Sequence, residues 1–320
     1  REIPAPGKSQ VTIIDLDEKS LAEIGQWPWP RSIVAKMVSN LTQMGAAVVA
    51  FDIFFPEPDR MNPDGVVASL AGLDAETRTK LLALPSNDQA LANTIKKSRV
   101  ILGQAGYWED RGVKAGPPVK KSVAFLGPKP HPYLLRFPDM VRNVPVIEKA
   151  ASGHGVVSLE PEIGNIVRRV PTLFVYNHDP ERDPKSDNLY PALAIEMLRV
   201  AYGRKTLAVR TNAAGVDSIG IVKGLVIRTD SHGRVWPYFS KSDKAKYVSA
   251  RDVLAGTVNP ALIKGKLTII GTSAAGMLDI RATPTERVMP GVEVHAQLIE
   301  TALSGSYLQR PNFINAAELM

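Results

Sequence analysis

Three aspartates follow apolar stretches whose composition is typical of buried strands. Asp15 and Asp17 lie near the end of VTIIDLDE, residues 11–18, and Asp52 lies within AAVVAFDIFFPEPD, residues 46–59. We expect the two strands to be neighbours, so that the carboxylates meet at the carboxyl ends of a parallel sheet, where open α/β sheets form a crevice. Such a group could bind a hard cation such as Mg²⁺ or Ca²⁺. Alternatively, each aspartate caps a following helix or turn.

A stretch rich in tryptophan and proline comes next, GQWPWPRS at residues 25–32. Its prolines fix φ and bias the preceding Trp27 and Trp29 toward extended backbone, which holds both rings in one arrangement. We expect Arg31, at the start of a helix, to pair with one of the strand-end aspartates and to brace the turn against the sheet. The alternative is that the same side chains form a ligand pocket or a signalling latch.

A second polar group lies near the end of the chain. Asp279, Arg281 and Thr283 follow the apolar stretch LTIIG, and they approach the same crevice if that stretch joins the sheet. Glu293 and His295 lie in the first turn of the last helix, where the helix dipole favours an acid. His295 titrates near neutrality and could give a pH response, and a packed, hydrogen-bonded histidine is the alternative.

Sequence motifs of known catalytic sites are incomplete. Met277 stands where a phosphate loop needs lysine, and Lys19 stands where the DxD motif of haloacid-dehalogenase phosphohydrolases has Thr or Val. Ser273 lacks a GxSxG context, no HExxH is present, and the absence of cysteine excludes thiol catalysis and disulfides. We therefore expect no catalytic residue and no cofactor, with a divalent cation at the strand ends as the one exception.

The N-terminal part predicts alternating strands and helices. Residues 32–44 carry apolar side chains at helical spacing, with Ser32 as the expected cap and Gly45 just past the end. A right-handed crossover would make the flanking strands parallel. Further expected elements are a short helix near Leu21, helices over residues 77–84 and 88–97, and a strand over residues 99–106.

The middle of the chain predicts antiparallel structure and loops. Residues 107–145 are rich in Pro, Gly and Lys, which indicates a long irregular segment. Residues 153–162 and 166–177 have the pattern of antiparallel neighbours, joined by a turn near Gly164. Later elements are a helix over residues 190–202, short strands with turns at Lys223-Gly224 and near His232, a strand and glycine turn over residues 265–276, and a final helix over residues 292–304.

These elements predict an α/β fold with a central, mostly parallel or mixed sheet flanked by helices, an antiparallel β extension and long irregular loops. We expect a single domain. Its α/β core takes in about residues 8–105 and 250–310, and a β-rich, loop-rich insertion takes in about residues 106–249.

Composition and charge fit a globular protein. Hydrophobic residues make up 44% and charged residues 22% of the 320 residues. The formal net charge is +7, and residues 199–250, with ten lysines and arginines against three aspartates, carry an excess of seven positive charges. This basic segment could face anionic lipid or a protein partner, and a solvated sheet surface is the alternative. We expect no nucleic-acid partner, because no nucleic-acid-binding motif accompanies the basic residues.

The start of the chain indicates a soluble piece of a longer protein. Arg1 opens the sequence without a charged and then apolar leader. No uninterrupted apolar run approaches the roughly 18 residues that a membrane-spanning helix needs.

The two ends of the chain resemble the CHASE domain of type 2. Residues 11–59 combine an acid-tipped strand, WPWPR, a helix and AFDIFF, and residues 265–311 contain IIGTSAAG, ATP and PGVEVHA in the order of that family. The two stretches cover about a third of the chain and bracket nearly all of it. Residues 105–250 depart from the family pattern.

The resemblance implies a periplasmic or extracellular sensor in a bacterial inner-membrane receptor, with a membrane anchor before Arg1 and several transmembrane helices after Met320. It also implies a cytoplasmic output, commonly a class III adenylate or guanylate cyclase and otherwise a histidine kinase, diguanylate cyclase or serine/threonine kinase. We expect a homodimer that responds to a small molecule or a periplasmic protein. One alternative is a periplasmic protein-interaction module of a sensor kinase or other receptor. A remote alternative is a Mg²⁺-dependent phosphohydrolase.

Overall fold

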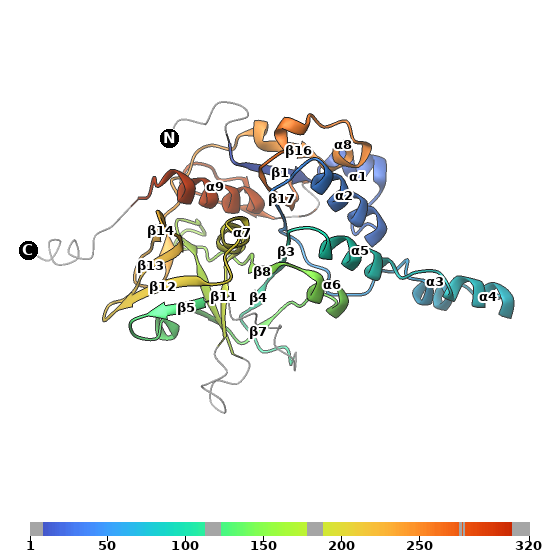
Figure 1. Cartoon of the computed structure of the whole chain (residues 1–320), viewed down its shortest axis with the longest axis horizontal. Coiled ribbons are helices and arrows are strands. Elements are labelled where there is room, and N and C mark those ends of the chain that lie inside the picture. The colour runs from blue at the N-terminus through green and yellow to red at the C-terminus, as the bar shows by residue number, and fades with distance from the viewer. Residues whose placement is uncertain (1–8, 113–122, 178–187, 275–276, 278, 309–320) are drawn as a thin grey trace, which may run out of the picture.

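A six-stranded parallel sheet forms the centre of the molecule, in the order β16-β1-β17-β2-β3-β8. The structure is a computed structural model that describes residues 9–112, 123–177, 188–274, 277 and 279–308 (Figure 1). The strands of the central sheet are β16 (Tyr247–Ser249), β1 (Val11–Asp15), β17 (Leu267–Gly271), β2 (Val48–Phe51), β3 (Val100–Gln104) and β8 (Gly153–Val156). The predicted α/β fold class, with a mostly parallel sheet, is confirmed.

Strand β17 lies between β1 and β2, which corrects one expectation. The strands of residues 11–18 and 46–59 are parallel in one sheet, as predicted, but they are not neighbours. Thr12 of β1 faces Thr268 of β17, and Thr268 in turn faces Val49 of β2. A strand from the end of the chain thus completes the sheet that the start of the chain begins. A distant segment can fill that position because parallel strands are joined by crossovers and not by tight turns.

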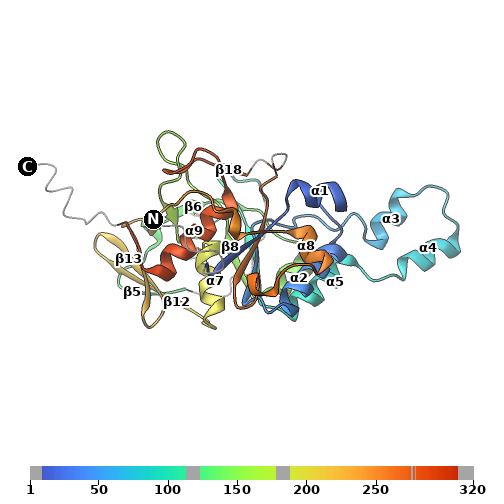
Figure 2. The same ribbon diagram turned by 90° about the horizontal axis from the view of Figure 1, so that it is seen from above.

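Helices cover both faces of this sheet, because its strands are apolar on both sides. One face packs against α1 (Glu18–Ile24), α2 (Arg31–Gln43), α5 (Asn87–Lys96), α6 (Pro145–Ala150) and α8 (Ala250–Ala255). The other face packs against α7 (Leu193–Ala201) and α9 (Gly291–Ser304). Figure 2 shows the two groups of helices on opposite sides of the sheet. Alternate residues of one strand enter different cores, as Ile13 and Ile14 of β1 do.

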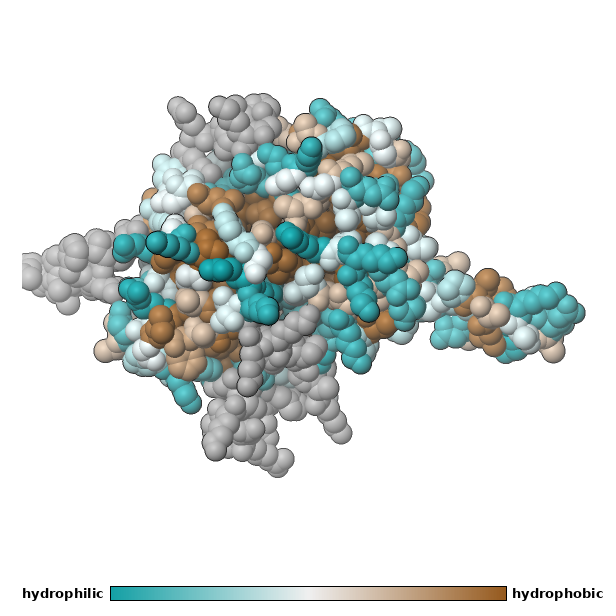
Figure 3. All heavy atoms as spheres, viewed as in Figure 1, coloured by the Kyte–Doolittle hydropathy of each residue, from teal (hydrophilic) through white to brown (hydrophobic). Residues whose placement is uncertain are grey.

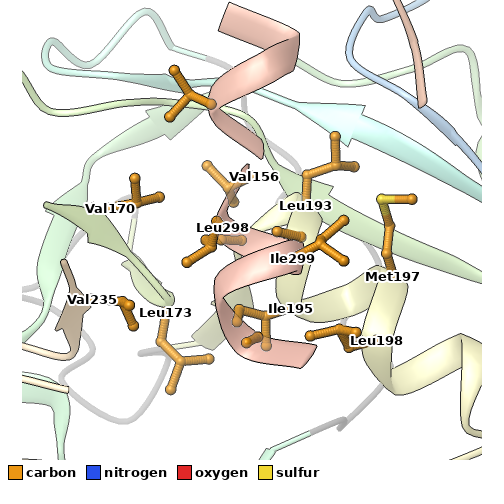
Figure 4. Close-up of a cluster of buried hydrophobic side chains, with 14 of the residues drawn as sticks. Val156, Val170, Leu173, Leu193, Ile195, Met197, Leu198, Val235, Leu298 and Ile299 are labelled. Atoms are coloured by element: carbon orange, nitrogen blue, oxygen red, sulfur yellow. The ribbon is translucent and has the colours of Figure 1, made fainter. Parts of the chain in front are cut away.

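The core around α7 and α9 joins the central sheet to the smaller sheets. Leu193 and Ile195 of α7 point toward Leu298 and Ile299 of α9, and Val156 of β8 lies beside them (Figure 4).

One smaller sheet is formed by β14 (Leu225–Arg228), β13 (Gly215–Val222), β12 (Leu207–Asn212) and β5 (Val123–Leu126). Another is formed by β11 (Asn188–Pro191), β10 (Leu173–Tyr176) and β6 (Leu135–Phe137). Three two-stranded pairs are β15 (Arg234–Val235) with β9 (Val170–Pro171), β18 (Ile280–Arg281) with β19 (Met289–Pro290), and β4 (Gly106–Tyr107) with β7 (Asp139–Met140). Short 3-10 turns span His131–Tyr133, Lys244–Lys246 and Pro260–Leu262.

The predicted antiparallel pairing of residues 153–162 with residues 166–177 is wrong. Residues 153–156 form β8, which pairs in parallel with β3 at the edge of the central sheet. A single bridge between Glu162 and Ile166 is what remains of the expected hairpin. Strand β8, with the sequence GHGV, is buried along its whole length, and its short pattern does not distinguish an edge strand from a hairpin arm.

Other predictions for the middle of the chain are confirmed. The hairpin that turns at Lys223-Gly224 joins β13 to β14, and the predicted helix over residues 190–202 contains α7. Within the predicted irregular segment the structure shows short strands and a 3-10 turn, and residues 113–122 lie outside the described part. Gly276 of the predicted glycine turn also lies outside it. Both edge strands of the central sheet, β8 and β16, come from the segment predicted as an insertion.

Two short helices project from the body as an arm, α3 (Pro63–Ser69) and α4 (Ala75–Leu82) (Figure 1). The predicted helix over residues 77–84 corresponds to α4, whereas α3 was not expected. The arm's surface carries both hydrophobic and hydrophilic residues (Figure 3). No residue of α4 is buried, so the arm adds little to either core.

Helix α2 begins differently from the prediction. It starts at Arg31, one residue earlier than expected, and Pro30 precedes it without a side-chain cap. The Arg31 amide instead donates to Asp59 Oδ2 at 2.6 Å, so a carboxylate distant in the sequence binds the helix start. Gly45 follows the helix with φ of +83°, as predicted for a helix end.

Candidate functional site

A pocket of about 570 Å³ opens where several strands of the central sheet end. Asp52 follows β2, Ala105 follows β3, Val157 follows β8, and Thr272 follows β17, and all four residues line the pocket. We call it the strand-end pocket. Its polar and aromatic walls include Asp52, Asp279, Arg281, His295, Trp27, Phe54 and Trp108. Its position matches the crevice at the carboxyl edge where open α/β sheets commonly bind ligands.

Asp52 is the most enclosed carboxyl group of this pocket. Its side chain is 5% exposed, and His295 Nε2 lies 3.7 Å from its Oδ1. Among the residues that the structure describes, no group donates a hydrogen bond to the Asp52 carboxyl. Burial raises the pKa of Asp52 well above its usual range, and the carboxylate of Asp279 raises this pKa further, whereas Arg281 lowers it.

His295 reaches the pocket from the first turn of α9. The residue is 1% exposed, and its Nε2 lies 3.3 Å from the carbonyl oxygen of Val157. Because a carbonyl only accepts, Nε2 carries the proton and Nδ1 is an acceptor. Nδ1 is buried and has no hydrogen-bond partner in the described part of the chain. Burial lowers the pKa of His295 to about 4, so the ring is neutral at pH 7.

Asp279 and Arg281 form an ion pair at the rim, with Asp279 Oδ1 3.0 Å from Arg281 Nη2. The pairing of β18 with β19 brings both residues to the start of α9. The Gly291 amide donates to the Asp279 carbonyl at 2.9 Å, and a Cβ at position 291 would lie 2.2 Å from Asp279 Oδ2. A glycine here lets the carboxylate sit directly against the first residue of the helix. Burial raises the pKa of Asp279, and Arg281 opposes that rise.

Aromatic side chains form the apolar part of the strand-end pocket. Trp27 packs edge-on against Trp29, with ring centroids 5.5 Å apart. Trp29 is 1% exposed and donates from Nε1 to the Gly25 carbonyl at 2.7 Å, so it fixes the turn while Trp27 faces the pocket. Trp108 is 63% exposed and packs edge-on against Phe137 at 5.0 Å. Aromatic faces attract flat apolar groups and organic cations.

The motifs at both ends of the chain, residues 11–59 and 265–311, contribute residues to the lining of this pocket. A family model described as the CHASE2 domain matches residues 1–319. The chain belongs to the CHASE2 family. CHASE2 domains are extracytoplasmic sensor modules and not catalytic ones. No curated protein and no solved structure matches the chain significantly. The described helices are all too short or too polar to cross a membrane.

Arg31 of the CHASE2 domain does not pair with the strand-end aspartates, which corrects that prediction. Its Nε lies 3.7 Å from Asp88 Oδ1, Nη2 donates to the Glu57 carbonyl at 3.2 Å, and its guanidinium lies 4.6 Å from the centre of the Phe55 ring. Asp59 binds its amide, as described above. The chain after β2 folds back over the start of α2, so the carboxylates of this loop and of α5 reach Arg31 first. Arg31 thus has the structural role that was predicted, but it joins the start of α2 to the loop after β2 and to α5.

Asp15 and Asp17 have separate structural partners. Asp15 accepts hydrogen bonds from the Ser273 amide at 2.8 Å and the Ser273 hydroxyl at 2.6 Å. Asp17 caps α1 through the Ser20 amide at 2.8 Å, as in the helix-cap alternative, and also accepts from Ser249 Oγ at 3.0 Å. Because β17 separates these residues from Asp52, the three aspartates do not share the predicted cation site. Within the described ranges, no three His, Asp or Glu side chains are grouped to hold a metal ion.

Glu293 and Thr283 also lie outside the pocket lining of the CHASE2 domain. Glu293 is fully buried and accepts hydrogen bonds from Ser242 Oγ at 2.5 Å and Tyr247 Oη at 2.6 Å, so it ties α9 to the β16 edge of the sheet. Thr283 donates from Oγ1 to the Glu286 carbonyl at 3.1 Å within a local turn. Both are structural contacts within the described fold.

The pocket therefore contains some of the predicted site residues together with others that the sequence reasoning missed. The predicted residues that line it are Trp27, Asp52, Asp279, Arg281 and His295. Phe54 and Trp108 were not predicted. Trp108 stands in a segment rich in Pro, Gly and Lys, and a large aromatic residue in such a loop is the signal that could have identified it.

Proposed function

We propose that this CHASE2 domain is the signal-binding part of a membrane-anchored bacterial receptor, and that the signal binds in the strand-end pocket. The observation that carries this proposal is the enclosed Asp52 carboxyl, which faces the pocket without a hydrogen-bond donor among the described residues. Buried polar groups are normally paired, so an unpaired one in a pocket marks a place where a ligand can bind.

Helix α9 is the element that would carry the signal onward. Gly291 and His295 place the start of this helix in the pocket wall, and the whole helix of 14 residues ends at Ser304. Buried side chains of α9 pack against both α7 and the central sheet, so a displacement of the helix would have to repack both contacts. A ligand that binds two positions of α9 with different affinity would shift the population between them.

The output that we propose is a cytoplasmic class III adenylate or guanylate cyclase, connected through transmembrane helices that flank the chain. We propose a homodimer, because cyclase and kinase outputs work as pairs and most symmetric receptors are twofold. The resemblance of the two chain ends to the sensors of such receptors supports this output and an inner-membrane position. In such a receptor a movement of α9 would change the spacing or rotation of the two following helices.

The test uses the full-length receptor in membrane vesicles and measures cyclic-nucleotide synthesis. Asp52→Asn keeps the size of the side chain and removes its ability to ionise, and Asp64→Asn makes the same change on the exposed arm as a matched control. We expect Asp52→Asn to change either the basal rate or the response to periplasmic extract, and Asp64→Asn to behave as wild type. Equal output from both variants at equal expression would overturn the pocket as the signal site.

A protein-interaction function is a second candidate, supported by the face of the β14-β13-β12-β5 sheet. Arg210 and Arg228 both lie opposite Ser218 on this sheet and are exposed. In contrast, Arg199 and Lys246 of the same basic segment are buried in ion pairs with Glu196 and Glu300. An acidic periplasmic partner would therefore meet the two sheet arginines.

Charge reversal separates this candidate from small-molecule binding. The double variant Arg210→Glu and Arg228→Glu should abolish capture of a protein partner and leave binding in the strand-end pocket unchanged. Retained capture of that partner by the double variant would remove the sheet face as its docking site. A response that depends on Asp52 and ignores both arginines would identify the pocket as the sensor.

A further inference from the structure

We infer that the strand-end pocket accepts a small organic cation, with a protonated amine near Asp52 and an apolar body against the tryptophan side chains. This inference rests on the proposed function, because it names the class of ligand for the same pocket. Three features of the described residues carry it: the unpaired carboxyl of Asp52, the mutual pairing of the other charges, and the aromatic walls.

The charges that line the pocket leave Asp52 as the group without a partner. Arg281 and Asp279 pair with each other at 3.0 Å, so their charges largely cancel. His295 donates through Nε2 to Val157 and is neutral, so it supplies no cation to Asp52. A ligand with a hydrogen-bond donor would satisfy the Asp52 carboxyl, and a cationic donor would do so most strongly, because charge-assisted hydrogen bonds are the stronger ones. An anionic ligand would instead oppose ionisation of Asp52 and would lie near the carboxylate of Asp279.

The aromatic walls favour the same kind of ligand. Trp27, Phe54 and Trp108 line the pocket with Asp52. Tryptophan faces attract ammonium groups through their quadrupole, and they bury the apolar part of a ligand at the same time. A pocket of about 570 Å³ holds a molecule of metabolite size. An inorganic cation would use neither the apolar wall nor its shape.

Binding of an amine should release a proton from Asp52. Burial keeps this carboxyl protonated above its usual range, and a bound ammonium group stabilises the ionised form. The charged and titratable groups that face Asp52 are His295 from α9 and Asp279 and Arg281 from the β18–β19 hairpin. Of these, His295 is neutral through the working range and the other two form an ion pair. Amine affinity should therefore rise with pH until Asp52 is ionised in the free protein.

The experiment compares three probes that share one apolar body: phenethylamine, 2-phenylethanol and 3-phenylpropionate. Each is titrated calorimetrically into the 320-residue chain at several pH values. We expect phenethylamine to bind at least about tenfold more tightly than the alcohol, with an affinity that rises with pH, and the carboxylate not to bind. Equal binding of the alcohol, or any preference for the carboxylate, would overturn the inference, and so would the absence of amine binding at millimolar concentration.

Two variants locate the binding. Asp52→Asn should lower phenethylamine affinity by at least about tenfold and remove its pH dependence, whereas Asp64→Asn should leave both unchanged. Trp108→Ala changes a side chain that is 63% exposed, so it tests the pocket without threatening the core, and it should also weaken amine binding. Amine binding that survives both pocket variants would place the amine elsewhere and overturn the inference.

The ligand class and the proposed function fail in different ways. If amines do not bind while Asp52→Asn still alters receptor output, the class of ligand is wrong and the pocket remains the signal site. If Asp52→Asn leaves receptor output unchanged, the pocket is not the signal site, whatever the chain binds in calorimetry.

Discussion

His295 and Asp52 meet at the carboxyl edge of the sheet, with Nε2 of the histidine 3.7 Å from Oδ1 of the aspartate. The two residues come from opposite ends of the chain and are both buried, and burial shifts their pKa values in opposite directions. A buried pair would ordinarily be expected to exist as an ion pair. Here desolvation favours the neutral form of each group, so the two side chains are in contact as a protonated carboxyl and a neutral imidazole and not as an ion pair.

The pH dependence of stability should report the burial of His295. Its pKa is about 4 in the folded state against 6.5 for a free side chain, so the unfolded chain binds a proton first as the pH falls. The contribution to stability is complete above about pH 6.5, is lost as the pH falls toward about 4, and amounts to roughly 3 kcal/mol at most. Thermal unfolding of His295→Gln should show a weaker decline over this range. An unchanged slope would mean that the histidine is already accessible to protons.

Asp52→Asn should have the opposite pH signature. The pKa of Asp52 is raised in the folded state, so the wild-type residue disfavours folding as the pH rises above its unfolded value of 3.8. The variant removes this destabilisation, so its melting temperature relative to wild type should increase as the pH rises above about 4. Asp64→Asn serves as the control with no such trend. A variant that becomes relatively less stable at high pH would show that Asp52 is ionised in the folded protein.

Arg31→Met should destabilise the domain strongly. The substitution keeps the amide that binds Asp59, but it removes the guanidinium that pairs with the buried carboxylate of Asp88, and such a loss typically costs roughly 3–5 kcal/mol. Adding Asp88→Asn should restore part of the loss, because it removes the uncompensated charge. Urea denaturation measures the free energy of unfolding of the single and the double variant. The control is Arg251→Met, which removes an exposed ion pair and should cost less than about 1 kcal/mol. Equal costs at the two positions would contradict the role of Arg31 as a buried brace.

Gly291→Ala should disturb the contact between the rim and α9. The added Cβ would lie 2.2 Å from Asp279 Oδ2, so the carboxylate or the helix must shift, at a cost of about 1–3 kcal/mol. Asp279→Ala in the same chain should relieve the clash. Gly220→Ala is the matched control, because its Cβ would make an ordinary contact of 3.5 Å with Ala208. Differential scanning calorimetry gives the melting temperature of the three variants. An unchanged melting temperature for Gly291→Ala would argue against close packing between Asp279 and the start of α9.

Local sequence patterns determined most of the α/β core. The apolar runs at β1, β2, β3 and β17 and the helical spacing in α2, α5 and α9 identify these elements, because burial on one or both faces imposes a period on the chain. The family also follows from short composite motifs at the two ends. One local signal was misleading: Ser32 has the chemistry of a helix cap, yet Asp59 binds the first amide of α2.

The neighbours of each strand and the partners of each charge were decided by the tertiary structure alone. Strand β17 begins 216 residues after the end of β2 in sequence, and its position between β1 and β2 separates Asp15 from Asp52. Arg31 pairs with Asp88 because α5, which carries Asp88, packs against α2. His295 reaches Asp52 because the β18–β19 hairpin and α9 close over the strand ends. The hydrophobic periodicity of a sequence indicates which face of an element is buried. Contacts between distant segments depend on the packing of the whole chain, and the strand-end pocket is formed by such contacts.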